Sequence, residues 1–189
     1  MKIAWGITGA GHYLRESIDV MEQIMKAGHQ VDIMISAAAE KVMEMYGVFN
    51  RVQKLNETYK KEGVHLYYEQ NQAPAFPICA RFNLHYYDLL ILSPLTANSV
   101  AKINVGIADT LITNIFAQML KGGGEVYVVP CDLVPGEIET EIPNGDTLKI
   151  HIDEFNAANA RALHKFPRVT IFQRPTELLA AIERHPAAH

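Results

Sequence analysis

The chain has 189 residues, of which 49% are hydrophobic and 20% are charged, and its formal net charge is −4. This length and composition predict one globular domain over residues 1–189 and exclude an intrinsically disordered chain. The negative net charge, without any run of Lys or Arg, argues against nucleic acid as a partner.

Histidines and cysteines give no sign of a metal centre. The eight histidines share no metal-ligand spacing, and Cys79 and Cys131 form no CxxC motif, so we expect neither a metal nor a disulfide. No apolar stretch reaches the roughly 18 residues of a membrane span. Because a strand pattern begins at Ile3, we expect no signal peptide and a cytoplasmic location.

Strand and helix patterns alternate along the first half of the chain. Buried-strand patterns occupy residues 2–7, 31–35 and 64–68, and helical patterns occupy 13–28, 37–45 and 50–62. A continuous apolar run, residues 89–92, is bounded by Asp88 and by Ser93-Pro94. Such a run is typical of a central parallel strand.

The second half continues the alternation until Pro130. Helices are expected near residues 96–105 and 109–120, with a strand over 126–129. A hairpin is then expected over 139–152, turning at Asn144-Gly145, followed by a helix over 153–164, a strand over 169–172 and a helix from Pro175. This order predicts an α/β fold, a Rossmann-like (flavodoxin-like) parallel sheet sandwiched by helices, with a β-hairpin arm.

A glycine-rich turn, residues 6–11, lies where the first strand passes into the first helix. Backbone amides and a helix N-terminus attract phosphate at such a place. The turn is not the dinucleotide fingerprint, because Leu14 replaces its third glycine and Ser36 stands where NAD sites have an acidic residue. A serine there donates to a phosphate. By itself, the turn weakly favours a binding site for a mononucleotide over one for a dinucleotide. The alternative is a tight turn that binds no ligand.

The segment 93–99 follows the most apolar strand, at the edge where α/β sheets bind ligands. Its residues are small and hydroxylated, and the Asn98 amide both donates and accepts, as the pyrimidine edge of a flavin requires. A helix N-cap would explain Thr96 or Asn98 singly. It does not explain a second small-residue turn so close by, at 106–109.

Together, the segments 94–99, 101–103 and 106–109 resemble the FMN-binding signature of the homo-oligomeric flavin-containing cysteine decarboxylase superfamily. The segments 76–79 and 142–145 make the chain most similar to its archaeoflavoproteins and acceptor-type dihydromethanopterin reductases. The resemblance implies a trimer-based homo-oligomer, for which the apolar residues of 112–120 are a candidate interface. It also implies FMN contacts from Thr8, Gly9, Ala10, Ser36, Ser93, Thr96, Ala97, Asn98, Ala108 and Asp109.

Two departures from the decarboxylases favour another activity within the superfamily. Their catalytic histidine is missing from residues 78–82, and residues 130–136 replace their Met-Asn substrate clamp. The resemblance therefore implies an FMN-dependent oxidoreductase that reduces a dihydropterin, dihydromethanopterin to tetrahydromethanopterin, by hydride transfer from reduced FMN. An FMN electron-transfer protein with a ferredoxin-like donor is the alternative, and a phosphopantothenoylcysteine-type decarboxylase is less favoured. Cys131 and Asp132 are the weak catalytic candidates, although a cysteine at a strand end is more often a small buried hydrophobe.

Overall fold

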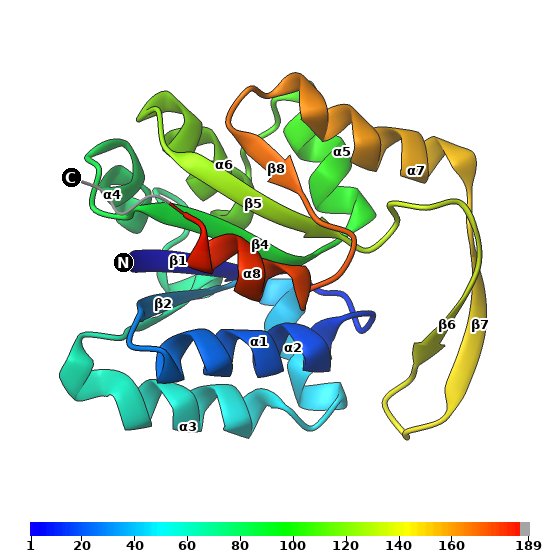
Figure 1. Cartoon of the computed structure of the whole chain (residues 1–189), viewed down its shortest axis with the longest axis horizontal. Helices are drawn as coiled ribbons and strands as arrows, with labels where there is room; N and C mark the ends of the chain where they lie inside the picture. The colour runs from blue at the N-terminus through cyan, green and yellow to red at the C-terminus, as the bar shows by residue number, and fades with distance from the viewer. Residues whose placement is uncertain (186–189) are drawn as a thin grey trace.

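The structure is a computed structural model, which describes residues 1–185, and it is built around a six-stranded parallel sheet (Figure 1). The strand order is β3-β2-β1-β4-β5-β8, and each neighbouring pair is parallel. The strands are β1 (Lys2–Ile7), β2 (Gln30–Ile35), β3 (Leu66–Tyr68), β4 (Leu89–Leu95), β5 (Glu125–Pro130) and β8 (Val169–Ile171). The predicted Rossmann-like α/β fold is confirmed.

Helices cover both faces of the sheet (Figure 1). One face carries α1 (Leu14–Lys26), α3 (Phe49–Tyr59) and α8 (Glu177–Glu183). The other carries α4 (Ala80–Asn83), α5 (Ala97–Val105), α6 (Leu111–Lys121) and α7 (Glu154–Arg161). Because strand side chains alternate, Trp5 of β1 packs in the first core while its neighbour Ala4 packs in the second. The sheet is therefore buried on both sides, as its apolar strands require.

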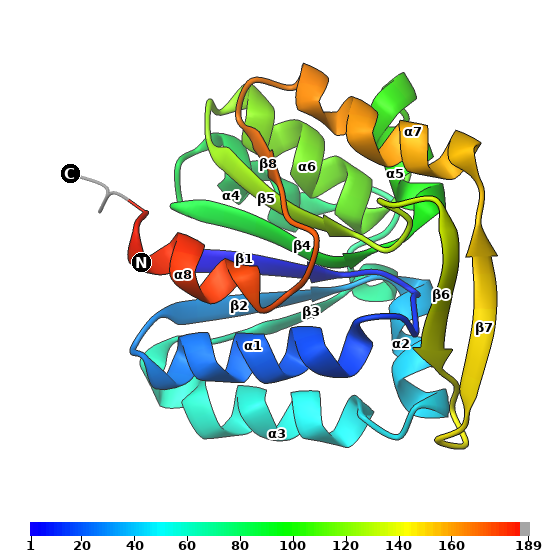
Figure 2. The ribbon, with the colours of Figure 1, turned by 45° about the vertical axis from the view of Figure 1, so that its right-hand side comes forward.

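Two elements lie at the carboxyl ends of the strands (Figure 2). Helix α2 (Ala37–Met45) follows β2 directly, and the antiparallel hairpin of β6 (Gly136–Glu141) and β7 (Thr147–Ile152) runs beside it. The hairpin begins at Gly136, earlier than the predicted residue 139. Gly145 takes a φ of 91° in its turn, a conformation that favours glycine.

Three expectations need correction. Ser93 and Pro94 do not bound the central strand but lie inside β4, whose register with β5 shifts between Leu92 and Leu95. The helices expected over 50–62 and 153–164 end earlier, at Tyr59 and Arg161, and are followed by the short 3-10 turns η1 (Lys60–Glu62) and η4 (Ala162–Lys165), while η2 (Glu69–Asn71) and η3 (Pro77–Cys79) lie between β3 and β4. The expectation that the apolar residues of 112–120 line an interface between subunits is wrong for four of them. These residues are buried in the second core of the chain itself: Ile112, Ile115, Phe116 and Met119.

Within residues 1–185, none of the helices combines the length and the apolar character that crossing a bilayer demands.

Candidate functional site

Two adjoining cavities open at the carboxyl ends of β1, β2 and β4, and they share Gly9, Thr96 and Asn98. The first, of about 220 Å³, lies where several helices begin, and we name it the helix-end cavity. The second, of about 390 Å³, reaches Thr140 and Ile150 of the hairpin, and we name it the hairpin cavity. Ligands bind to Rossmann-type sheets at this edge, so the pair of cavities is the candidate site.

Three helices begin at the helix-end cavity, each with a hydroxyl side chain as its N-cap. The Ser36 Oγ accepts from the Ala39 N–H at 3.0 Å at the start of α2. Thr96 caps α5 and Thr110 caps α6 in the same way. The first amides of a helix have no partner within it, and they carry the positive end of its dipole. The cavity therefore favours an anionic group.

The Thr8 side chain joins the ends of the two central strands. Its hydroxyl donates to the Pro94 carbonyl at 2.7 Å and accepts from the Thr96 N–H at 2.9 Å. The side chain is 2% exposed, so these bonds are shielded from water. The next residue, Gly9, meets α2 closely, since a Cβ there would lie 2.6 Å from the Ala38 Cβ. Thr8 and Gly9 thus shape the cavity between β1 and the start of α2.

The ionisable groups of the hairpin cavity are His12 in the turn after β1, Tyr46 at the end of α2, and Cys131 and Asp132 after β5. Burial lowers the pKa of His12, and the positive charge of Arg174 lowers it further, so this imidazole is neutral near pH 7. Burial raises the pKa of Asp132, and the negative charge of Asp153 adds to that rise. Among the described residues that line the cavity, Asp132 therefore provides the one carboxyl group, and the imidazole of His12 carries no positive charge near pH 7.

Cys131 also lines the hairpin cavity, but its thiol is buried and donates to the His12 carbonyl at 3.7 Å. Burial raises its pKa far above the usual range of a thiol. Because the thiolate is the nucleophilic form, the structure does not favour Cys131 as a catalytic nucleophile.

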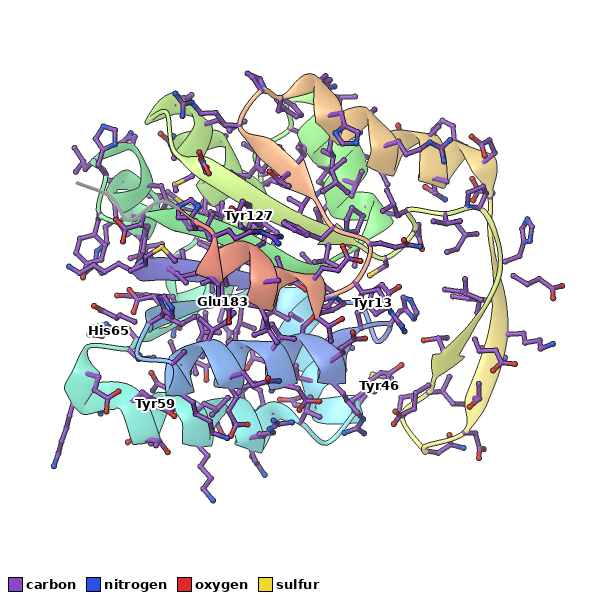
Figure 3. All side chains as sticks on the ribbon, in the orientation of Figure 1. Tyr13, Tyr46, Tyr59, His65, Tyr127 and Glu183 are labelled. Carbon is purple, nitrogen blue, oxygen red and sulfur yellow. The ribbon has the colours of Figure 1, made fainter. Side chains whose placement is uncertain are left out.

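The hairpin is held against the body by three polar contacts. The Tyr46 hydroxyl donates to the Glu141 carbonyl at 2.9 Å, and the Arg15 Nε donates to the Glu141 carboxylate at 2.9 Å. The His12 Nδ1 lies 3.3 Å from the Thr140 Oγ1. Figure 3 shows Tyr46 and Tyr13 at the end of the body that faces the hairpin. The arm thereby forms one wall of the hairpin cavity.

Seven of the ten predicted FMN contacts line one or both cavities: Thr8, Gly9, Ala10, Ser36, Thr96, Ala97 and Asn98. The other three line neither. Ser93 is fully buried, with its Oγ 2.8 Å from the Ser17 Oγ. Ala108 and Asp109 are exposed, and the Asp109 carboxylate pairs with the Lys102 ammonium at 2.9 Å. The role of these three in binding FMN stays a prediction.

Three residues that the sequence reasoning missed also line the cavities. Glu69 and Thr110 line the helix-end cavity, and Tyr46 lines the hairpin cavity. Glu69 follows β3 directly, so its position at the carboxyl end of a strand was a usable signal. Tyr46 carries no such signal, because only the folded position of the hairpin brings it to the site. The hairpin itself was expected from the sequence to form a wall of the substrate pocket, and Thr140 and Ile150 of the hairpin line the cavity.

The hairpin contacts give a prediction for Arg15→Met, which keeps the apolar stem and removes the guanidinium. Losing its bonds to the Glu141 carboxylate and to the Tyr46 carbonyl should free the arm. We expect faster amide hydrogen exchange over residues 136–152, measured by mass spectrometry. Lys41→Met, which breaks the exposed Lys41–Glu44 pair instead, is the control and should leave this exchange unchanged. Equal exchange in both variants would show that Arg15 does not hold the arm.

No group of three or more His, Cys, Asp or Glu within the described part of the chain is placed to hold a metal ion.

The chain is similar in sequence to known proteins over most of its length. The family model described as "Flavoprotein" matches residues 1–188. The chain is 42% identical over 146 residues to dihydromethanopterin reductase (acceptor) of Methanocaldococcus jannaschii, covering 76% of this chain and 58% of that protein. It is 40% identical over 145 residues to the enzyme of the same name from Methanosarcina mazei, covering 75% and 59%. The chain thus spans less than two thirds of the length of both reductases.

Solved structures show the same architecture. The structure of Burkholderia xenovorans DmrB in complex with FMN, described as a cubic protein cage for redox transfer, superposes with a TM-score of 0.75 at 30% identity. This match covers 96% of the chain and 93% of DmrB. A dodecameric FMN-dependent UbiX-like decarboxylase from Escherichia coli O157:H7 superposes with a TM-score of 0.62 over 90% and 79% of the two chains. Its 19% identity indicates a shared fold alone.

Proposed function

Because the chain belongs to the flavoprotein family, we propose that it binds FMN across the two cavities and acts as an FMN-dependent oxidoreductase. The observation that carries the proposal is the convergence of three capped helix N-termini on a cavity beside the glycine turn. The FMN complex of DmrB, at 30% identity, supports the choice of cofactor.

The residues present fit one phosphate and one flat ring. The Ser36 hydroxyl accepts from the Ala39 N–H, so its own hydrogen remains available to a phosphate, as do the first amides of α2. The small Ala97 and the amide of Asn98 suit the flavin ring. The other predicted contacts, Ser93, Ala108 and Asp109, rest on the family resemblance, since they line neither cavity. Bound FMN supplies hydride and electron transfer chemistry.

The hairpin cavity is the proposed substrate site, and a dihydropterin is the proposed substrate. The identities of 42% and 40% to two dihydromethanopterin reductases support the reduction of dihydromethanopterin to tetrahydromethanopterin. Reducing a C=N bond requires a proton on the nitrogen. The Asp132 carboxyl lines this cavity, and its raised pKa suits it to hold that proton and to donate it.

A second candidate is electron transfer from a ferredoxin-like donor without a small substrate. It is favoured by the description of DmrB as a cage for redox transfer. Decarboxylation is the least favoured activity, because residues 78–82 contain no histidine.

The first test of the proposed function concerns the cofactor. We expect the purified protein to release FMN, and no FAD, on denaturation, as chromatography will show. Gly9→Ala should weaken FMN binding at least about tenfold, or ~1.4 kcal/mol, because the new Cβ would meet Ala38 and narrow the cavity. Gly124→Ala is the control, since its Cβ would meet the Met119 side chain and Gly124 lines neither cavity. FAD in the released fraction, or no flavin after reconstitution, would refute the proposal.

The second test concerns Asp132 and uses the sign of its pKa shift. If the protonated carboxyl is the active form, dihydropterin reduction should slow as the pH rises through the raised pKa of Asp132. Asp153→Asn keeps an N-cap side chain for α7 but removes the charge that raises this pKa, so the fall should move to lower pH. Asp132→Asn should lower the rate by about 10²-fold or more.

These rates are measured at constant reduced flavin by following flavin reoxidation over a pH range that begins near the ordinary pKa of an aspartate, about 4, and extends upward. A D132N variant with the natural rate and pH profile would exclude Asp132 as the proton donor. Flavin reoxidation by the dihydropterin that is no faster than in buffer would contradict the pterin proposal. Rapid electron exchange with a ferredoxin in the same protein would then support the electron-carrier proposal.

A homo-oligomer is the third expectation. Two solved relatives are described as a cubic cage and as dodecameric, and we propose a trimer-based assembly here also. Multi-angle light scattering should show a multiple of three copies. A monomer that carries a full complement of FMN would contradict this expectation.

A further inference from the structure

We propose that the Glu69 carboxylate accepts a hydrogen bond from an uncharged donor of the bound flavin, a ribityl O–H or the ring N–H. This bond would determine the orientation of the cofactor in the site. The proposal rests on the proposed function, because it requires FMN in the helix-end cavity. It concerns a residue outside the expected FMN contacts.

Glu69 is held in the cavity wall by a contact between two elements. It is the first residue of η2, directly after β3, and it lines the helix-end cavity. Its Oε2 accepts from the backbone N–H of Leu111 at 3.1 Å, at the start of α6. Within residues 1–185, its Oε1 has no hydrogen-bond partner. One carboxylate oxygen is thus anchored, and the other remains available to a ligand.

The other polar groups of the cavity differ from Glu69 in what they offer. The hydroxyl hydrogens of Thr8 and Thr96 are already donated, to the Pro94 carbonyl and to the Ser99 Oγ. The Ser36 and Ser99 hydroxyls and the first amides of α2 remain as donors, and the Asn98 amide is an uncharged group that both donates and accepts. Among the described residues that line this cavity, Glu69 is the one charged acceptor.

This division of donors and acceptors selects an asymmetric ligand. A phosphate is stabilised at the amides of α2 and repelled by a carboxylate, an effect that strengthens where water is excluded. The ribityl hydroxyls and the ring N–H of a flavin are uncharged donors, and a carboxylate is the stronger kind of acceptor for them. FMN satisfies both sides when its phosphate lies beside Ser36 and a donor group lies beside Glu69.

The experiment compares two flavins in three proteins. Dissociation constants of FMN and of riboflavin, which lacks the phosphate, are measured by quenching of flavin fluorescence. The proteins are the natural chain, Glu69→Gln and Glu40→Gln. Glutamine at position 69 keeps an oxygen for the Leu111 N–H and removes the charge. Glu40 is the matched control, because its carboxylate accepts from Gln70 at 2.9 Å, next to Glu69, but does not line the cavity.

We expect E69Q to raise the dissociation constants of FMN and of riboflavin by the same factor, about tenfold. We expect E40Q to leave both dissociation constants unchanged. Tighter FMN binding by E69Q with unchanged riboflavin binding would show that Glu69 faces the phosphate, and it would overturn the proposal. Unchanged affinity for both flavins would show that Glu69 only anchors α6. If the natural protein bound neither flavin, the proposed function itself would fail.

Thermal unfolding of the flavin-free proteins separates binding from folding. We expect E69Q to unfold within a few degrees of the natural protein, because the bond to Leu111 is kept. If E69Q does not fold, Glu69→Asp, which keeps the charge on a shorter side chain, takes its place. It should weaken both flavins equally, and a change confined to FMN would again overturn the proposal.

Discussion

The site depends on one shielded hydroxyl. Thr8, at the end of β1, bonds at once to a carbonyl and to an amide of the chain leaving β4, so the turn after one strand is fixed against the turn after the other. Parallel neighbours such as β1 and β4 are far apart in sequence, so bonds between the strands must align their ends, and the Thr8 N–H also donates to the Pro94 carbonyl at 3.2 Å. A side chain that both donates and accepts aligns them without leaving a buried polar group unpaired.

Around this junction, the site is assembled from segments that each follow a strand. The turn after β1, the start of α2, the η2 turn, the start of α5 and the end of β5 all reach the cavities. The hairpin then closes one side through contacts with Arg15, Tyr46 and His12. Donors gather near α2 in the helix-end cavity, where Glu69 is a charged acceptor, and the hairpin cavity has the Asp132 carboxyl group with its raised pKa, so the two cavities have different chemical characters. Such a division suits a cofactor with an anionic end and a substrate beside it.

Features set by local sequence were predictable. The glycine turn, the apolar strands and a helix that begins after Ser36 follow from short patterns, and the structure has them where the patterns place them. The N-cap considered for Thr96 as an alternative to flavin binding is also present. Ser93 was expected to contact FMN because of the family resemblance, but β4 continues through it and its side chain bonds to Ser17. The place of Glu69 directly after β3 was a usable local signal, whereas Tyr46 requires the position of the arm, which no short window encodes.

The burial of both cysteines has a consequence if the chain handles reduced flavin as proposed. Reduced flavins react with dioxygen to form peroxide, which oxidises thiolates much faster than protonated thiols. Burial raises the pKa of Cys79 to about 12 and that of Cys131 still further above its usual range, and Cys131 lines the hairpin cavity. Both sulfurs are thus held in the protonated form, which peroxide oxidises slowly, so neither cysteine is a favoured site for sulfenic acid.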